Sequence, residues 1–367
     1  MTFSANDHAA MARALVLAEQ GLNTTSPNPR VGCVIIKDGQ IVGEGWHRRA
    51  GEPHAEIHAL QMAGNAARGA TAYVTLEPCS HFGRTPPCVD ALTRAGISRV
   101  VAAIQDPNPL VSGQGMAHLH AAGIQAESGL LETEAKALNI GFITRMKTGR
   151  PWVRLKAAAT LDGKTALLNG TSQWITGEAA RQDSHHWRAR ACAILTGIGT
   201  VKADNPRLTV RGIPCERQPL RILIDPRLEV SPQAAILADA PVLIITANTH
   251  TALHTVFTTQ GHTVIVQATD TEGRFNLAQL LQFLAQEYTL NEIHVEAGQK
   301  LNGALLRAQC IDELLLYFAP ILAGDQAQGM FYFNPLNSLE QATHLNIVDL
   351  RVIGNDLRLI ARPHHSR

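Results

Sequence analysis

Short apolar segments alternate with helical segments through most of the chain, and this alternation constrains its fold more than any other feature. In the first half they predict the order β-β-α-β-α-β-α-β, beginning with "VGCVIIKDGQIVGEGWH" from residue 31. Two strand-like runs there flank Asp38-Gly39, a dipeptide favoured in type I′ hairpin turns. Such alternation is typical of α/β domains, in which helices cover a largely parallel sheet.

The second half has the same α/β character. Seven apolar runs predict buried strands, and "LNIVDLRVIG" with "DLRLIAR" predicts a final hairpin-like pair. Because 367 residues exceed one ordinary core, we expect two domains. A single helix is predicted over "ETEAKALNIGFIT", and the polar segment "RMKTGRP" follows it. We therefore place the domains at residues 1–147 and 148–367.

Charge balance and apolar pattern exclude several classes of function. With 32 basic and 31 acidic side chains, the chain lacks the basic excess typical of proteins that bind nucleic acid or an anionic membrane surface. No stretch approaches the roughly 20 apolar residues that span a bilayer. The first residues predict an amphipathic helix rather than a signal peptide. We therefore expect a cytoplasmic protein that acts on a small molecule, with most of its six cysteines as free thiols.

One group of metal-ligand residue types stands out in the first half. His54 opens a predicted helix, Cys79 follows the next strand, and Cys88 opens the next helix. All three can therefore lie at the end of the sheet where open α/β folds bind ligands. Imidazole and thiolate suit Zn²⁺, and three protein ligands leave the fourth tetrahedral position for water, as in catalytic zinc sites.

Glu56, two residues after His54, fits a proton shuttle beside the zinc. H-x-E followed by P-C and a later Cys is typical of zinc nucleoside and nucleobase deaminases, in which the Glu lies outside the coordination sphere. Two other arrangements stay open from the residues alone. His58 could pair with His54 as in a zincin, although a zincin has Glu directly after the first His. His81 could instead complete a closed structural zinc site.

The spacing of the two cysteines departs from the usual deaminase pattern. Eight residues separate Cys79 from Cys88 where two are usual, so the additional residues must form a loop that leaves the metal and returns to it. We expect this loop to carry His81, Arg84 and Thr85 over the mouth of the metal site. The alternative is a tolerated surface insertion.

Several motifs together resemble the bifunctional riboflavin-biosynthesis deaminase/reductase family. They are "PNPRVGCVI", "AGEPHAEIHAL", "YVTLEPCSHFGRTPPC" and "DPNP" in the first half and "LKAAATLDGKTA", "SQWITG" and "VEAGQKLNGALL" in the second, so the resemblance covers essentially the whole chain. It implies an α/β chain with an N-terminal cytidine-deaminase-like α/β/α domain. It also implies zinc bound by His54, Cys79 and Cys88, with Glu56 as the proton donor.

The implied first reaction is hydrolytic deamination of 2,5-diamino-6-ribosylamino-4(3H)-pyrimidinone 5′-phosphate. Asn28 and Asn108, in two "PNP" stretches, are candidate substrate contacts, although each also suits an ordinary turn. Two other interpretations are another zinc nucleoside or nucleobase deaminase with an appended non-reductase domain, and a domain in which zinc only stabilises the fold.

The second half lacks the usual dinucleotide fingerprint. "LTGIGTVK" offers Gly197-x-Gly199 but has Lys202 where the third glycine would stand. A lone G-x-G is more often a tight strand-to-helix turn. It does supply a helix N-terminus with free backbone N–H groups, and Gly298 opens a second such helix, so the two could cradle phosphates.

The family resemblance implies that this half is a dihydrofolate-reductase-like α/β domain that uses NADPH. It would reduce the ribosyl group of the deaminated pyrimidine to a ribityl chain, and a homodimer would form through the reductase halves. The implied NADP contacts are Ala158, Trp174, Thr200, Asp204, Gly298, Gln299, Lys300, Leu301, Asn302, Gly303 and Ala304. The implied substrate contacts are Ser172, Arg188, Leu208, Arg211 and Glu296.

Several of these residues also suit ordinary structural roles. Trp174 could be a core residue, Arg188 part of a solvated helix face and Asp204 a helix cap. Arg188 and Arg211 suit the substrate's 5′-phosphate, because guanidinium makes bidentate contacts with phosphate oxygens. Lys156 and Asp204 are the candidates for the acid that assists reduction.

Overall fold

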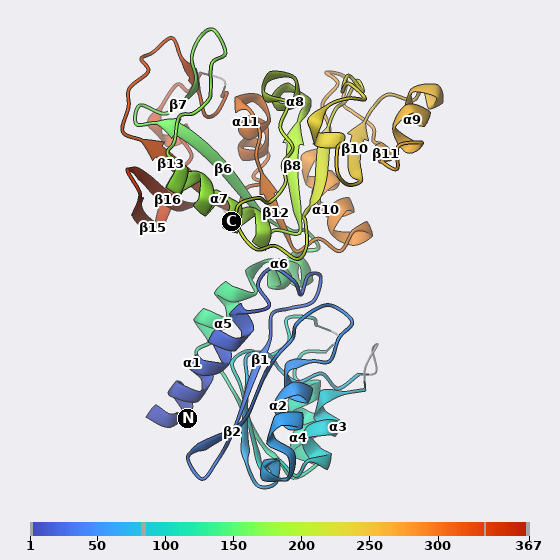
Figure 1. Ribbon diagram of the computed structural model, residues 1–367, viewed down its shortest axis with the longest axis vertical. Coiled ribbons are helices and arrows are strands. Elements are labelled where there is room, and N and C mark those ends of the chain that lie inside the picture. The colour runs from blue at the N-terminus through green and yellow to red at the C-terminus, as the bar shows by residue number, and fades with distance from the viewer. Residues whose placement is uncertain (1–2, 82–85, 110, 334, 365–367) are drawn as a thin grey trace. The chain divides into compact units, whose positions relative to one another are not determined.

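The computed structural model describes residues 3–81, 86–109, 111–333 and 335–364, and the chain divides into two compact units, Met1–Arg150 and Pro151–Arg367 (Figure 1). Helix α6 (Ile140–Thr148) continues through most of the polar segment 145–151 at which we placed the domain boundary, one residue past the predicted end of the first domain. It ends where Gly149 adopts a left-handed conformation with φ of 71°, a common way to end a helix. No helix in these ranges combines the length and the apolar character that crossing a membrane would require.

The first unit is built on a five-stranded sheet of order β2-β1-β3-β4-β5. Strands β1 and β2 form the predicted hairpin, and Asp38 and Gly39 have the positive φ angles, 50° and 76°, that a type I′ turn requires. From β3 onward the neighbouring strands are parallel. The strands are β1 (Gly32–Lys37), β2 (Gln40–Trp46), β3 (Thr71–Val74), β4 (Arg99–Ala102) and β5 (Gln125–Ser128).

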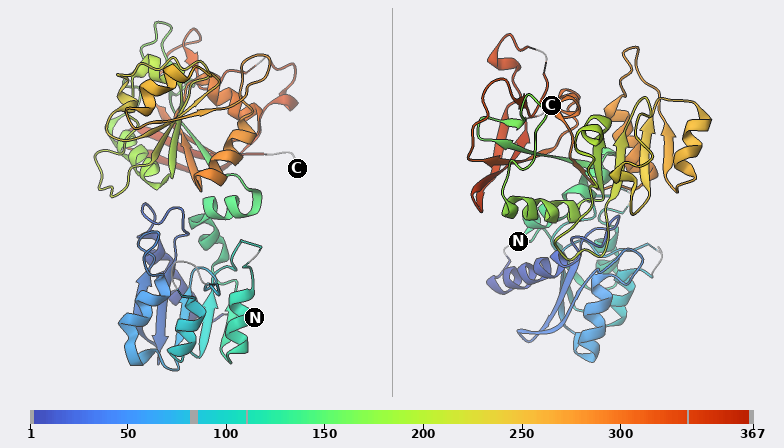
Figure 2. Two further views of the ribbon diagram at one scale, coloured as in Figure 1. Left: turned by 90° about the vertical axis from the view of Figure 1, so that its right-hand side faces the viewer. Right: turned by 45° about the horizontal axis from the view of Figure 1, so that its top comes forward.

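Helices cover both faces of this sheet, and the predicted α/β/α layering of the first unit is confirmed (Figures 1 and 2). Two glycines allow the helices to approach closely, since a β-carbon on Gly32 would lie 2.0 Å from a backbone oxygen of α1 and one on Gly45 would lie 2.4 Å from a backbone oxygen of α2. One face carries α1 (Ala5–Glu19) and α5 (Glu132–Leu138), and the other carries α2 (Ala55–Ala63), α3 (Cys88–Arg94) and α4 (Gln114–Ala121).

The single helix predicted over residues 132–144 is wrong, because α5 and α6 are separate helices that meet at Asn139. The Asn139 side chain is buried and exchanges two hydrogen bonds with the backbone of Arg30, each 2.8 Å long. Asparagine side chains that bond to backbone groups compete with helix formation. This long-range pair therefore accounts for the break.

The second unit contains a nine-stranded sheet of order β11-β10-β9-β8-β12-β6-β13-β16-β15. The strands are parallel from β11 to β13, and β16 and β15 complete the sheet as the predicted antiparallel pair. The strands are β6 (Trp152–Thr160), β8 (Ala193–Gly197), β9 (Leu220–Ile224), β10 (Val242–Thr246), β11 (Thr263–Val266), β12 (Glu292–Val295), β13 (Glu313–Ala319), β15 (Leu345–Ile353) and β16 (Asp356–Pro363). Strands β7 (Lys164–Ala166) and β14 (Gln328–Gly329) form a separate two-stranded antiparallel sheet.

Apolar cores lie on both faces of this sheet, because successive strand residues point to opposite sides. Leu195 and Ile222 belong to the core that includes residues of α10 and α11, whereas their neighbours Ile194 and Leu223 belong to the core that includes residues of α8 and α9. The expected burial of β11 is wrong, because this edge strand has a single neighbour and none of its residues is fully buried. The helices are α7 (Glu178–Arg190), α8 (Ile198–Asp204), α9 (Thr251–Thr258), α10 (Leu277–Glu287) and α11 (Gln299–Arg307).

Candidate active sites

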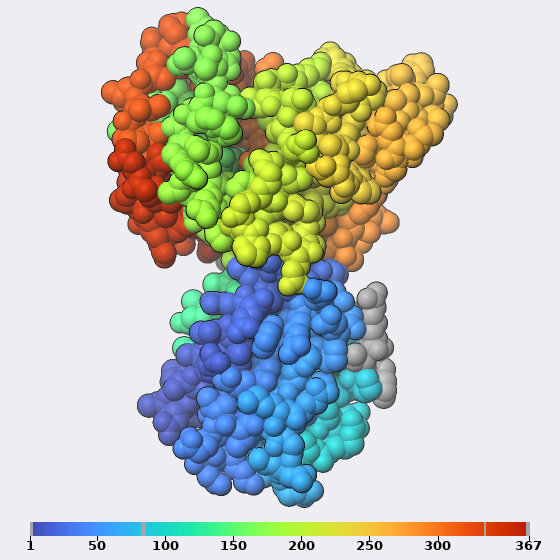
Figure 3. Space-filling model, in the orientation of Figure 1, coloured from blue at the N-terminus to red at the C-terminus, as the bar shows by residue number. Residues whose placement is uncertain are grey.

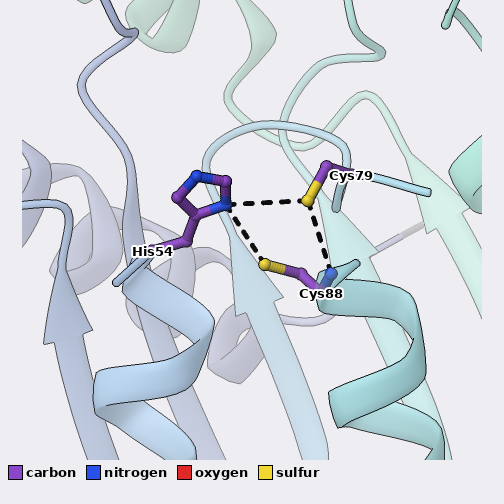
Figure 4. A group of neighbouring side chains, drawn as sticks. All are labelled: His54, Cys79 and Cys88. Atoms are coloured by element: carbon purple, nitrogen blue, oxygen red, sulfur yellow. Dashed lines mark hydrogen bonds between the residues drawn. The ribbon is translucent and has the colours of Figure 1, made fainter. Parts of the chain in front are cut away.

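The three predicted metal ligands meet at one end of the first unit's sheet. His54 caps the N-terminus of α2, Cys79 follows β3, and Cys88 is the first residue of α3. Their side chains point toward one another (Figure 4). The Nδ1 atom of His54 lies 3.3 Å from Sγ of Cys88 and 3.6 Å from Sγ of Cys79.

These distances fit a zinc ion bound between the three atoms. Zn–S bonds of about 2.3 Å and Zn–N bonds of about 2.0 Å at tetrahedral angles place nitrogen and sulfur about 3.5 Å apart. The three atoms lie within 4.8 Å of one another, and they are the one cluster of His, Cys, Asp or Glu ligands of this kind among the described residues. Neither His58 nor the exposed His81 belongs to that cluster. The zincin arrangement and the closed four-ligand site are therefore not what the described residues form.

The two thiols shift each other's pKa in opposite directions, so Cys88 holds its proton more firmly than Cys79 does. The contact with Cys88, together with that of His54, lowers the pKa of the Cys79 thiol to about 4. The same contact with Cys79, together with burial, raises the pKa of the Cys88 thiol. Because zinc binds thiolates, metal binding would release this proton.

Glu56 lies in the first turn of α2, beside the ligands and outside their cluster. Its side chain is buried, and its Oε2 atom has no hydrogen-bond partner in the structure. Burial raises the pKa of this carboxyl above its ordinary value. A buried carboxylate with a raised pKa and a free oxygen is suited to accepting and returning a proton near neutral pH.

A cavity of about 500 Å³ opens onto His54, Cys79 and Glu56. Asn28 and Asn108, the two candidate substrate contacts, both line it. His81 also lines this cavity, whereas the predicted positions of Arg84 and Thr85 lie outside the described residues.

The sequence reasoning did not single out His47, which is buried in the wall of the same cavity. Its Nε2 atom lies 3.1 Å from Nδ2 of Asn28, and its Nδ1 atom lies 3.2 Å from the carbonyl oxygen of Pro53. If Nδ1 donates to that carbonyl, Nε2 accepts from the Asn28 amide, and the Asn28 amide oxygen is left for other contacts. The position of His47 directly after β2, where the strand reaches the metal end of the sheet, was the available signal.

The second unit has its own cavity, of about 890 Å³, formed along the carboxyl ends of parallel strands. Ala158 lies in β6, Arg188 in α7, Thr200 and Asp204 in α8, and the remaining predicted residues lie in connecting segments or at the start of α11. All the predicted NADP and substrate contacts line the cavity except Gly303 and Ala304. Those that line it are Ala158, Ser172, Trp174, Arg188, Thr200, Asp204, Leu208, Arg211, Glu296, Gly298, Gln299, Lys300, Leu301 and Asn302.

Two helix N-termini face this cavity from neighbouring strands. Gly197 precedes α8 and Gly298 precedes α11, and both glycines line the cavity. A β-carbon on Gly197 would lie 3.2 Å from the side chain of Leu301, in α11, so the two helices begin close together. Gly303 does not face the cavity. A β-carbon there would lie 2.1 Å from the carbonyl oxygen of Tyr332, so it lets α11 pack against that segment.

Two residues predicted to face the substrate bind each other. Arg188 and Glu296 form a bidentate ion pair, in which Nη2 lies 2.9 Å from Oε2 and Nε donates to Oε1. Lys156 lies 3.9 Å from the same carboxylate. Burial raises the pKa of Glu296, but Arg188 and Lys156 outweigh it, and the pKa lies well below its ordinary value. Glu296 is therefore ionised.

Two of the structural alternatives are wrong for this cavity. Trp174 is 71% exposed and stacks on the guanidinium of Arg181, so it is not a core residue. Arg188 is not part of a solvated helix face, because its guanidinium is held by Glu296 and by the carbonyl oxygen of Thr209 at 3.0 Å. Asp204 accepts a hydrogen bond of 3.1 Å from the hydroxyl of Ser172.

Fold and sites together define a zinc-dependent deaminase of the cytidine deaminase class, joined in one chain to an NADPH-dependent α/β reductase. The family model of the cytidine and deoxycytidylate deaminase zinc-binding region matches residues 4–104, and that of the RibD C-terminal domain matches residues 151–359. The chain belongs to the RibD family of riboflavin biosynthesis proteins, whose members join a deaminase to a reductase.

Relatives match over nearly their whole length. The riboflavin biosynthesis protein RibD of Escherichia coli K12 is 47% identical over 96% of this chain and 98% of its own, and that of Bacillus amyloliquefaciens is 45% identical over 97% and 96%. The solved structure of Acinetobacter baumannii RibD (form 1) superimposes with a TM-score of 0.91 at 44% identity, covering 98% of this chain and 99% of that one. The predicted combination of a cytidine-deaminase-like and a dihydrofolate-reductase-like domain is confirmed.

Proposed function

We propose that residues 1–147 deaminate 2,5-diamino-6-ribosylamino-4(3H)-pyrimidinone 5′-phosphate and that residues 148–367 reduce the product. A solved relative from Thermotoga maritima, 32% identical over 98% of this chain and 99% of its own with a TM-score of 0.86, bears the name of a deaminase and reductase for substrates of this kind. The observation that carries the deaminase proposal is the meeting of His54, Cys79 and Cys88 beside buried Glu56 in one cavity.

The residues of this chain divide the deamination between them. His54, Cys79 and Cys88 would hold zinc. When bound, zinc would lower the pKa of a water molecule to near neutrality and so supply the nucleophile for the pyrimidine ring. Glu56 accepts a proton from the attacking water and delivers it to the departing amine, which leaves as ammonia. Asn28 and Asn108 contact the pyrimidine from the cavity wall.

In the second unit, NADPH supplies the hydride that converts the ribosyl group to a ribityl chain. The starts of α8 and α11 offer backbone N–H groups to its phosphates. Ala158, Trp174, Thr200 and Asp204 line the rest of the cofactor site.

Arg211 binds the substrate's phosphate end, while Arg188 faces the substrate with its guanidinium paired to Glu296 and keeps that carboxylate ionised. Ser172 and Leu208 complete the substrate wall, with Gly303 and Ala304 supporting α11 from behind the cavity. Lys156 and Asp204 are the two groups positioned to supply the proton of the reduction.

A coupled assay on purified full-length protein tests both halves separately. The diamino-pyrimidine phosphate is supplied with and without NADPH, while ammonia release and NADPH oxidation are followed independently. We expect ammonia release without NADPH, and NADPH oxidation only after ammonia has been released. NADPH oxidation with the undeaminated substrate in zinc-free protein would contradict this order.

We further propose a homodimer formed through the reductase unit, in the cytoplasm. Strand β15 is an edge of the nine-stranded sheet, and the C-terminal segment that contains it lies at the surface of its unit (Figure 3). Ile347, Leu350 and Val352 on this strand are 67, 59 and 69% exposed. An exposed apolar edge strand is an association surface unless it is covered. Val352→Lys should shift the sedimentation coefficient to that of a monomer. Cys33, Cys79, Cys88 and Cys215 are free thiols, which suits a reducing compartment, and cell fractionation tests this location.

A further inference from the structure

Glu77 is a buried carboxylate that the deamination chemistry above does not use. It lies between β3 and the first ligand cysteine, and 4% of its surface is exposed. Four backbone N–H groups donate to it. Those of Asp106 and Gly113 reach Oε2 at 3.0 Å each, and those of Gly115 and Met116 reach Oε1 at 2.8 and 3.2 Å. Each oxygen therefore accepts two bonds from one segment that lies 29 to 39 residues away in the chain.

These bonds attach that segment to the strand that leads to the metal. Gly115 and Met116 are in the first turn of α4, whose N–H groups have no partner inside the helix, so Glu77 caps α4 from a different element. A β-carbon on Gly115 would lie 2.2 Å from the carbonyl oxygen of Pro78, so the two segments are in direct backbone contact.

The attached segment forms part of the wall of the deaminase cavity. Asp106, Asn108 and Val111 all line it. The backbone N–H of Asn108 donates to the carboxylate of Asp106 at 2.8 Å, and the carbonyl oxygen of Asn108 accepts from the N–H groups of Val111 and Ser112 at 2.9 Å each. Asn108 therefore lies between Asp106 and Gly113, both of which donate their N–H groups to Glu77, and it is bonded to Asp106 directly.

We propose that Glu77 is a positioning residue for the deaminase, whose carboxylate fixes the wall carrying Asn108 relative to the metal ligand Cys79. The proposal rests on the proposed deamination. In it, the Glu77 side chain sets the distance between the metal site and the substrate contact Asn108. A carboxylate is required because all four partners are donors. The amide of Gln would turn its own N–H groups toward two of them.

The test compares Glu77→Gln and Glu77→Asp with Glu44→Gln in zinc-loaded full-length protein. Glu44 is a matched control in the same unit. It forms an ion pair with Arg13, and the side chains of both residues are partly exposed. Four quantities are measured: zinc content, hydrogen exchange of the peptide covering 106–116, kcat and KM for ammonia release, and NADPH-dependent reduction of the deaminated substrate.

We expect Glu77→Gln to keep its zinc and its reductase activity, while KM for deamination rises at least tenfold and kcat changes less than threefold. Faster hydrogen exchange should be confined to residues 106–116. Glu77→Asp keeps the charge on a shorter side chain and should raise KM less. Glu44→Gln should match the wild type in all four measurements.

Unchanged KM and unchanged exchange in folded Glu77→Gln would overturn the proposal. Loss of zinc with wild-type KM in the remaining active protein would also overturn it, because Glu77 would then support only the metal ligand. If Glu77→Gln does not fold, Glu77→Asp decides by the same KM criterion. A wild-type protein that releases no ammonia overturns the proposed reaction instead, and the exchange comparison, which needs no substrate, still shows whether Glu77 anchors the wall.

Discussion

Glu56→Gln should abolish deamination while leaving the protein folded and metal-loaded. The substitution keeps the shape of a side chain that is 3% exposed, so it creates neither a cavity nor overpacking. It removes the proton acceptor, and a positioned general acid or base contributes about 10²- to 10⁴-fold to rate. At about 1.36 kcal/mol per decade, the activation barrier should rise by about 3 to 5 kcal/mol. The free energy of unfolding should change by less than about 1 kcal/mol, because a buried carboxylate with a raised pKa is replaced by a neutral amide.

The assay follows ammonia release on protein whose zinc content is measured in the same preparation. Reduction of the deaminated substrate by NADPH serves as an internal control, because the second cavity is lined by residues of the other unit alone. More than a tenth of the wild-type kcat with zinc bound would refute the role of Glu56 as proton shuttle. Loss of zinc from Glu56→Gln would refute its position outside the coordination sphere.

Three further outcomes follow from particular contacts. A chelator that removes zinc should stop ammonia release and leave reduction by NADPH intact, and loss of both activities would contradict two independent sites. Burial and the guanidiniums of Arg188 and Arg211 lower the pKa of His185 to about 4, and its Nδ1 accepts the backbone N–H of Arg211. Its stabilising contribution is therefore complete above the unfolded pKa of about 6.5 and is lost as pH falls toward 4. His185→Gln should make the unfolding free energy less sensitive to pH in that window, and equal pH slopes would contradict this. Gly303→Ala should weaken NADPH binding in a fluorescence titration and destabilise the second unit by about 1 to 3 kcal/mol, because its β-carbon would meet the Tyr332 carbonyl; unchanged affinity would show that α11 does not depend on this packing.

The metal centre was predictable because its chemistry is carried by side-chain type and by element boundaries. Histidine and cysteine are characteristic zinc ligands. Their positions at the start of α2, after β3 and at the start of α3 placed all three at one end of one sheet. Glu56 followed from its spacing to His54. The hairpin of β1 and β2 was equally predictable, since Asp-Gly, here Asp38-Gly39, is one of the few dipeptides that suit a type I′ turn.

Glu77 could not be found in this way, because its partners are backbone N–H groups, which every residue except proline possesses. Nothing in the side chains at 106, 113, 115 and 116 indicates that their N–H groups converge on one carboxylate. Asn139 presents the same difficulty, since its bonds to the backbone of Arg30 span 109 residues. Bonds to the backbone over long sequence separations therefore explain why the sequence revealed neither of these two features.

The near-neutral charge of the chain, with 32 basic and 31 acidic residues, gave no sign of two opposite local environments. The described lining of the first cavity includes Glu52, Glu56, Glu77 and Asp106 and no Lys or Arg, which suits a site that holds a dication and moves protons. The second cavity is lined by eight Lys or Arg side chains and three Asp or Glu side chains, which suits a dinucleotide and a phosphorylated sugar. Because the Arg188 charge is matched by Glu296, the attraction for phosphate comes from the cations that remain. Two chemistries with opposite electrostatic needs are thus separated into two cavities, and the near-zero total charge of the chain reveals the character of neither cavity.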